Sequence, residues 1–387
     1  MAHLLREYAK SLGVKTSKPI IKDHFFPILA DKYITISNDD NIPSKHYPYY
    51  SVVLDLIKPL LRDRGIQIIQ LGGKSQIAGV DLAVNVKYKQ QSFILSKSIL
   101  HLGSDGFLNH TASVKNIPTV NVFGNTLPDI NKPIFSGSSL NINLSPKWDK
   151  KPCYNNIDPK KQINTIKPEV IAQSVLDLLK IDEEINFNTV QIGDAFNQKI
   201  LEIVPTSIMD MTASQDSLII IRADYGFDEN VFLQYCKTNK VSVCCDKLIQ
   251  PQGMQQIANN VKDFYLFIDK DWDDIPENYF RIIKSFNINL IILCENKEDV
   301  PIIRNKYFDV VVRHAYPERN KPKTLGENSK FFSQKRVVCD GKEYLSYAHF
   351  KKGLDRSNTV IDTPEYWRES DHFYIYDTDK NSQEKSS

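Results

Sequence analysis

Residues 101–124, HLGSDGFLNHTASVKNIPTVNVFG, contain the pattern that decides the fold of the first half of the chain. An apolar strand is expected to end at Gly103, and a helix is expected to begin at Asp105. A second buried strand, residues 119–123, ends on Gly124. Strand, helix and strand in this order, with glycines at the strand ends, predict a doubly wound α/β domain.

The polar residues at the end of the first of these strands are candidates for a binding site. Ser104, Asp105 and Gly106 follow the strand directly, so they lie at the carboxyl edge of the predicted sheet. The N–H groups and the positive dipole end of the next helix face the same edge, and His110 lies one turn into that helix. A diphosphate binds at this place in open α/β sheets. The competing interpretation is that Asp105 caps the helix and that His110 is a surface residue with its hydrogen bonds satisfied.

Elements that flank this stretch continue the alternation of helices and strands. In the first half the expected elements are helices 2–12, 52–61, 93–100 and 167–179 and strands 32–37, 66–71 and 99–102. Residues 127–166 are rich in proline and asparagine and are expected to form an irregular surface loop. In the second half the expected elements are strands 189–192, 217–221, 241–245, 264–268, 288–293 and 310–312 and helices 279–285 and 300–306.

The pattern changes again near the C-terminus. Asp340-Gly341 predicts a hairpin turn within residues 336–345, and Thr363 with Pro364 predicts the start of a last helix. The polar tail is expected to be disordered. The predicted domains are residues 1–181, 189–330 and, as an extension, 331–387.

The stretch 101–124 resembles the nucleotide-binding motif of the heptosyltransferase family, the ADP-heptose:lipopolysaccharide heptosyltransferases and their relatives. That motif is an apolar strand, Asp, a small residue, His, Ala, and Pro before a strand that ends in Phe-Gly. The matching residues, in order, are Asp105, Gly106, His110, Ala112, Pro118, Phe123 and Gly124. Together with other segments, the resemblance covers roughly residues 1–180.

Two further segments follow the order of this family. Residues 44–48, SKHYP, resemble its small-Lys-x-Trp-Pro turn with Tyr in place of Trp, and the resemblance implies that Lys45 meets the phosphates of a sugar nucleotide. Gly72 and Gly73 resemble the loop after the second strand, and Gln76 stands where relatives often have an acid that holds the ribose. The residues that the resemblance assigns to the donor are Ser44, Lys45, Gly72, Gly73, Gln76, Ser104, Asp105, Gly106 and His110.

The two halves stand in the reverse of the family's order, in which the acceptor domain comes first. We therefore hypothesise a circular permutation, with the second half as the acceptor-side domain. Residues 218–230 resemble the family's opening strand, and a carboxylate near that loop acts in relatives as the general base on the acceptor hydroxyl. Asp228 is the first candidate for this base, Asp224 and Asp194 are alternatives, and His110 is expected to assist at the diphosphate. For each acid taken alone, a solvated loop carboxylate is the competing interpretation.

The resemblance implies a GT-B fold, in which two Rossmann-like domains face each other across a cleft, with a C-terminal hairpin and helix extension. It implies a glycosyltransferase that moves a sugar from a nucleotide sugar to a glycan, a protein or a nucleic acid such as a modified DNA base. Neither a metal ion nor another cofactor is expected. Two alternatives stay open: a sugar-nucleotide epimerase, and a binding or structural protein that keeps the fold without turnover.

Composition adds few constraints. There are 49 Lys and Arg against 47 Asp and Glu, so the near-zero net charge gives no global argument for nucleic acid or a membrane surface. The six cysteines form no C-x-x-C pair, which is typical of reduced thiols in a cytoplasmic protein. No apolar run is long enough to span a bilayer. The acidic run 269–274 lacks the glycine and terminal glutamate of a calcium loop and is interpreted as a solvated turn.

Overall fold

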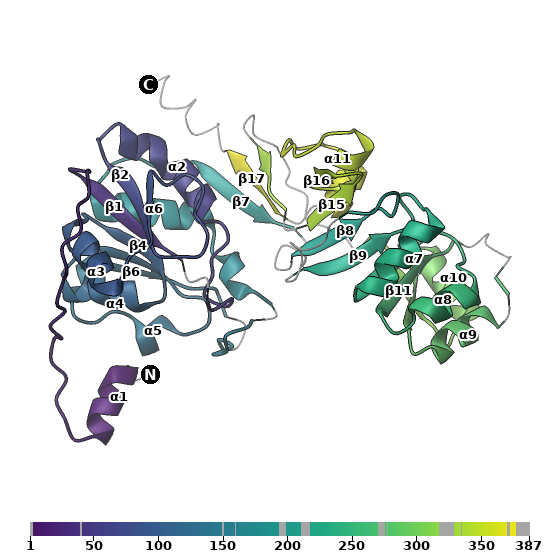
Figure 1. The fold of residues 1–387 in the computed structure, drawn as a ribbon, viewed down its shortest axis with the longest axis horizontal. Helices are drawn as coiled ribbons and strands as arrows, with labels where there is room; N and C mark the ends of the chain where they lie inside the picture. The colour runs from purple at the N-terminus through teal and green to yellow at the C-terminus, as the bar shows by residue number, and fades with distance from the viewer. Residues whose placement is uncertain are drawn as a thin grey trace. The chain divides into compact units, whose positions relative to one another are not determined.

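The computed structural model divides into two compact units, one ending at Thr189 and the other running from Val190 to Tyr376 (Figure 1). The structure describes residues 3–38, 41–148, 151–158, 160–192, 199–209, 217–269, 275–276, 278–316, 329–333, 335–369 and 372–376. The prediction of an α/β fold with a Rossmann-like sheet in each half of the chain is confirmed.

The first unit is built on a six-stranded parallel sheet with the order β3-β2-β1-β4-β5-β6. Its strands are β1 (Tyr33–Ser37), β2 (Gln67–Leu71), β3 (Leu82–Val84), β4 (His101–Ser104), β5 (Thr119–Val122) and β6 (Asn141–Leu144). This is the strand order of doubly wound dinucleotide-binding domains. The order reverses between β1 and β4, so the loops after these two strands diverge and leave room for a ligand at their carboxyl ends.

The helices of the first unit contact each other in pairs, α1 with α5, α2 with α6 and α3 with α4. The helices are α1 (Leu4–Ser11), α2 (Tyr50–Arg62), α3 (Tyr88–Lys97), α4 (Phe107–Val114), α5 (Pro128–Asn131) and α6 (Pro168–Leu179), with 3-10 turns at Ser138–Leu140 and Gln162–Thr165. As predicted, α1 stops at Gly13, whose φ is +65°, and α6 opens with Pro168.

Residues 127–166 differ from the prediction of an irregular loop, because they contain α5 and the edge strand β6. The sequence of β6, Asn-Ile-Asn-Leu, lacks the apolar character of a buried strand. Its asparagines instead pair across the sheet: Thr119 donates to Asn141 Oδ1 at 2.6 Å, and Asn121 donates to Asn143 Oδ1 at 3.0 Å. Polar cross-strand pairs of this kind stabilise a strand that hydrophobicity does not reveal.

The second unit is built on an eight-stranded sheet with the order β13-β12-β11-β10-β9-β8-β15-β16, in which only β16 is antiparallel to its neighbour. Its strands are β8 (Ile200–Ile203), β9 (Leu218–Arg222), β10 (Val241–Cys245), β11 (Val261–Phe267), β12 (Asn289–Cys294), β13 (Val311–His314), β15 (Lys335–Cys339) and β16 (Lys342–Tyr344). The helices are α7 (Glu229–Thr238), α8 (Pro251–Ile257), α9 (Tyr279–Ser285), α10 (Asp299–Lys306), α11 (Tyr347–Lys351) and α12 (Pro364–Glu369).

Strands β8 to β13 follow one another in a single direction, so right-handed crossovers place α7 to α10 on the same face of this sheet. Buried side chains from all four helices, among them Phe232, Met254, Ile283 and Ile303, share one core with the strands. The predicted hairpin forms between β15 and β16, where Asp340 and Gly341 both have positive φ. The strand predicted at residues 189–192 is part of β7 (Phe187–Gln191), which belongs to a separate sheet with β14 (Lys330–Phe331) and β17 (His372–Tyr376).

Candidate functional site in the first unit

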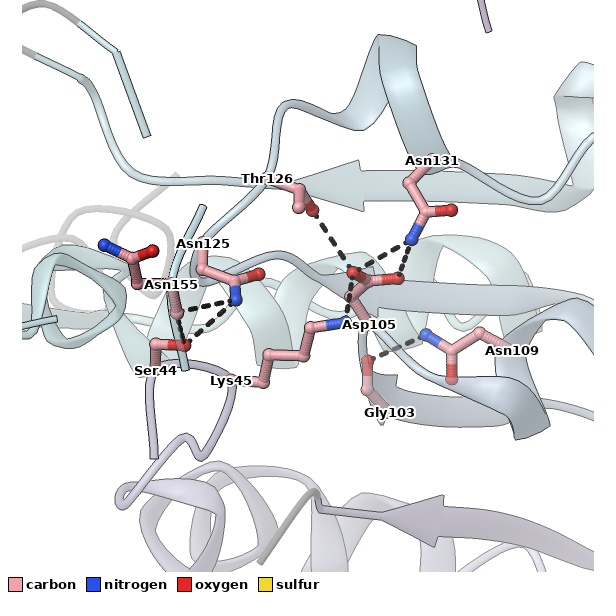
Figure 2. A network of polar contacts seen from close by, with 9 residues as sticks. All are labelled: Ser44, Lys45, Gly103, Asp105, Asn109, Asn125, Thr126, Asn131 and Asn155. Carbon is pink, nitrogen blue, oxygen red and sulfur yellow. Dashed lines mark hydrogen bonds and ion pairs between the residues drawn. The ribbon is translucent and has the colours of Figure 1, made fainter. Parts of the chain in front are cut away.

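The candidate site lies at the carboxyl ends of β1 and β4, where the strand order reverses. Lys45 follows β1 and Asp105 follows β4, and their side chains form an ion pair with a distance of 2.9 Å between Nζ and Oδ2 (Figure 2). Two residues separated by 60 positions in the sequence therefore meet at the place where α/β sheets bind phosphates.

The Asp105 carboxylate is buried and accepts hydrogen bonds from three side chains. The residue is 1% exposed, and besides Lys45 it receives Thr126 Oγ1 at 3.2 Å and Asn131 Nδ2 at 3.0 and 3.2 Å (Figure 2). The N-cap of α4 is Gly106, so the alternative that Asp105 caps this helix is wrong. Asp105 instead fixes the position of the Lys45 ammonium and of the loop after β5.

The Lys45 ammonium keeps donors for a ligand. It carries three N–H groups, and within the described part of the chain it donates one hydrogen bond, to Asp105. Its side chain is 16% exposed, so the cation is sheltered from water without being cut off from it. A cation held in this way is prepared to bind an anion at little cost in side-chain entropy.

Ser44 connects the loop that carries Lys45 to two other loops. Its N–H donates to Asn156 O at 2.9 Å and its Oγ donates to Asn155 O at 2.6 Å, while Asn125 Nδ2 donates to Ser44 Oγ at 3.0 Å. Gly124 lies against the same loop, since a Cβ there would stand 2.0 Å from the Ser44 carbonyl oxygen. Ser44 is 1% exposed, so it positions Lys45 and offers little surface to a ligand.

Helix α4 begins at the same edge of the sheet. The N–H groups of its first turn have no carbonyl within the helix to bind, and its dipole places partial positive charge there. His110 lies one turn further along and is half-buried. Burial lowers its pKa, with smaller contributions from Asp105, which raises it, and from His3 and Lys45, which lower it. The imidazole is therefore mainly neutral at pH 7, so it can exchange hydrogen bonds with a ligand but adds little positive charge.

A buried polar network supports β4 and α4 beneath the site. His101 contacts Thr35 Oγ1 at 3.0 Å and Asn109 Oδ1 at 3.1 Å, and Asn109 Nδ2 donates to the carbonyl oxygen of Gly103 at 3.1 Å. Burial lowers the pKa of His101 to about 4, so it is neutral. Ser104 is buried and donates to Asn38 Oδ1 at 2.9 Å, which gives it a structural role in this network.

The remaining predicted donor residues lie in the loop after β2. Gly72 and Gly73 have φ of +66° and +93°, a backbone conformation that other residues rarely adopt. Gln70, which no sequence motif indicated, holds this loop in place: its Nε2 donates to Gly72 O and Ser75 O at 3.1 and 2.8 Å. Gln76 is exposed in the same loop.

An apolar recess of about 340 Å³ lies along α4 beside His110. Phe107, Thr111 and Val114 line it from α4, Tyr88 lines it from α3, and residues 19–22 form another wall. The rings of Tyr88 and Phe107 are 3.9 Å apart between centroids and tilted by 52°. Because Phe107 is 57% exposed, the recess offers an aromatic surface that a planar ring can cover.

The predicted catalytic acids belong to the second unit. Asp228 is exposed and caps α7, where its Oδ1 accepts the Val231 N–H at 3.0 Å. Asp224 is bound to Arg222 through both oxygens, with its closest contact, Nη2 to Oδ2, at 2.6 Å. Asp194 lies outside the described residues. The role of each acid as a base stays a prediction.

Sequence reasoning missed Asn125, Thr126 and Asn131, which complete the network around Lys45 and Asp105 (Figure 2). One signal was available, because Asn125 and Thr126 directly follow the strand that ends on Gly124. This strand is the neighbour of β4, one of the two strands between which the strand order reverses. Polar residues that follow its carboxyl end therefore lie at the same edge of the sheet as the site.

Comparisons with known proteins find similarity only among solved structures. No family model matches the chain, and no curated protein matches it. The E. coli heptosyltransferase WaaC with ADP is 19% identical over 44% of this chain and 54% of its own, with a TM-score of 0.31. A glycosyl transferase of family 9 from Veillonella parvula DSM 2008 is 16% identical over 45% and 50%, with a TM-score of 0.33. The dodecameric iron-containing heptosyltransferase TibC in complex with ADP-D-beta-D-heptose is 15% identical over 44% and 51%, with a TM-score of 0.35.

Each of these matches spans about half the length of the similar protein. Among the described residues, no helix is both long and apolar enough to cross a membrane. Within the same residues, no three metal-ligating side chains gather in one place, and the expectation of a metal-free reaction stays a prediction.

Proposed function

We propose that this protein is a glycosyltransferase whose first unit binds a nucleotide sugar through its diphosphate. The observation that carries the proposal is the Lys45 ammonium, which a buried Asp105 holds at the reversal of strand order in a sheet of dinucleotide-binding topology. Burying an ion pair costs free energy, because both partners are removed from water. A buried pair at this position is therefore expected to serve ligand binding rather than stability.

The proposed chemistry follows from the charges at this edge. When the bond between sugar and diphosphate breaks, negative charge grows on the diphosphate oxygens. Lys45 and the first-turn N–H groups of α4 stabilise that charge in a fixed arrangement, which lowers the barrier without reorganisation during the reaction. His110, neutral and beside them, contributes a hydrogen bond. We propose that these groups stabilise the leaving diphosphate, the role that a divalent cation has in other transferases.

The nucleobase is proposed to bind in the recess along α4. His110 lines that recess and lies one turn into α4, the helix that begins just after Asp105, so the recess adjoins the proposed phosphate position. Replacing Phe107 with alanine should then weaken binding of a nucleoside diphosphate several-fold and leave binding of inorganic diphosphate unchanged. Phe25→Ala is the matched control, because Phe25 is also an exposed aromatic residue of this unit, 74% exposed.

Asp228 is proposed as the base that takes the proton from the acceptor hydroxyl. It is exposed, and one of its oxygens caps α7, whereas Asp224 has both oxygens engaged by Arg222. An acceptor hydroxyl can therefore approach the Asp228 carboxylate without displacing an arginine. Circular permutation of the family's domain order remains part of this proposal.

The test is turnover of nucleotide sugars by the wild-type protein. Purified protein is incubated with ADP-, UDP-, GDP- and dTDP-linked hexoses and candidate acceptors, and free nucleoside diphosphate and acceptor-linked sugar are measured, with and without EDTA. We expect transfer from one nucleotide family, insensitive to EDTA, abolished in Lys45→Met and retained in Lys58→Met. Lys58 is the matched control because it forms an ion pair of 2.7 Å with Asp81 at the amino edge of the same sheet.

Other outcomes would replace the proposal. Formation of an isomerised nucleotide sugar without transfer would assign an epimerase, and binding without any turnover would assign a binding protein. Equal turnover by wild type and Lys45→Met would show that the diphosphate does not bind at Lys45.

A further inference from the structure

The side-chain amide of Asn125 has a fixed orientation next to Lys45. Its Nδ2 donates to Ser44 Oγ at 3.0 Å and to Asn155 O at 3.1 Å, and Ser44 Oγ gives its own hydrogen to Asn155 O at 2.6 Å. Both neighbours of the amide nitrogen therefore accept hydrogen bonds. Turning the amide over would bring its oxygen against two acceptors, so the nitrogen has to lie on this side.

The other end of the amide is buried without a hydrogen bond. Asn125 is 4% exposed, and no donor among the described residues reaches its Oδ1. A buried acceptor without a partner costs about 1–3 kcal/mol, and native proteins rarely keep one without a reason. The Oδ1 points away from Ser44 and Asn155, toward the side where the Lys45 ammonium and the Asp105 carboxylate lie (Figure 2).

This arrangement sets a chemical requirement on whatever binds beside Lys45. The ammonium attracts an anionic group, but ionised phosphate oxygens only accept hydrogen bonds, so a diphosphate cannot satisfy Asn125 Oδ1. The missing partner is a donor, and it has to stand next to the anionic group. A sugar hydroxyl close to the diphosphate of a nucleotide sugar meets both conditions.

We propose that Asn125 Oδ1 accepts a hydrogen bond from a hydroxyl of the sugar attached to the diphosphate, which makes Asn125 a residue that selects the sugar. This inference rests on the proposed function, because it needs the diphosphate at Lys45. Sites built to bind a hydroxyl reject analogues without it, since the buried acceptor is then left unpaired.

The experiment measures how much the sugar adds to affinity in wild type and in Asn125→Leu, which keeps the shape of the side chain but lacks the amide. Binding of ADP, UDP, GDP and dTDP and of ADP-glucose, UDP-glucose, GDP-mannose and dTDP-glucose is measured by calorimetry. For each pair the ratio of the two dissociation constants gives the contribution of the sugar. Asn125→Ser takes the place of the leucine variant if that variant does not fold.

We expect at least one sugar to strengthen binding in wild type, and we expect Asn125→Leu to reduce that contribution about ten-fold while the nucleoside diphosphates bind within about three-fold of wild type. An unchanged sugar contribution in Asn125→Leu, or no contribution for any pair in wild type, would overturn the inference while leaving the diphosphate site intact. A bound water that satisfies Oδ1 permanently would give the first of these results. If no nucleotide binds to wild type at all, the proposed function fails, and this inference fails with it.

Discussion

Replacing Lys45 with methionine tests whether its ion pair with Asp105 holds the site together. Asp105 is 1% exposed, so the variant keeps a buried carboxylate whose remaining side-chain donors, among the described residues, are Thr126 and Asn131. Removing one partner of a buried pair costs about 3–5 kcal/mol. Because two donors remain and the Lys45 side chain is 16% exposed, we expect a loss near the lower limit, about 3 kcal/mol. Adding Asp105→Asn removes the uncompensated charge and should restore roughly half of this loss.

The assay is urea unfolding of the full chain, followed by a fluorescence signal that reports on the first unit only. A signal of this kind is needed because two units need not unfold in one transition. A background with Trp272→Phe and Trp367→Phe leaves Trp148, in the first unit, as the single tryptophan of the chain. Lys58→Met is the control, since that pair is 24% and 34% exposed and should cost no more than about 1 kcal/mol. A loss of under about 1 kcal/mol in Lys45→Met, or a double variant less stable than the single one, would refute the reasoning.

Three further predictions concern the backbone and the core. Gly124→Ala should destabilise the first unit by about 1–3 kcal/mol, because its Cβ would stand 2.0 Å from the Ser44 carbonyl oxygen. Gly137→Ala is the control and should have almost no effect, because its Cβ meets nothing nearer than 3.8 Å. Equal melting temperatures for the two variants would contradict this prediction. Burial lowers the pKa of His101 from 6.5 to about 4. Between these two pH values the unfolded chain binds a proton that the folded protein does not. The free energy of unfolding should therefore fall by on the order of 3 kcal/mol as the pH drops from 6.5 to about 4. His101→Gln should remove this part of the pH dependence in urea titrations, and parallel profiles for the two proteins would be the contrary result. Gly341→Ala should lower the melting temperature at a cost of about 1 kcal/mol, because φ there is +75°; an unchanged transition would show that the turn relaxes.

Elements with strong hydrophobic periodicity were predictable from the sequence. Helices α2 and α6 and strands β2, β5 and β10 lie where the apolar pattern placed them, since each buries a continuous apolar face. Strand β6 was not predictable, because polar side-chain pairs with β5 replace the hydrophobic pattern. Short strands such as β3 and β8 have too few residues to show a period.

The site was predictable where a local pattern carries the chemistry. The sequence identified Lys45 and Asp105 as donor-site residues, but it gave no sign that they form a pair, because they are 60 positions apart in the chain. Asn125 could have been placed at this edge of the sheet, because it directly follows a strand, but its role could not be predicted: the amide oxygen without a partner arises only from the packing of three loops. Spacing alone also could not distinguish Asp228, which caps a helix, from Asp224, which an arginine binds.

Calorimetric titration of the protein with ADP, UDP, GDP and dTDP tests the central claim most directly. If Lys45 holds a diphosphate, at least one of these nucleotides will bind to wild type and to Lys58→Met, and binding to Lys45→Met will be at least about ten-fold weaker, as the loss of a charge-assisted contact requires. Binding that is equal in all three proteins, or no binding of any nucleotide to wild type, would contradict the account.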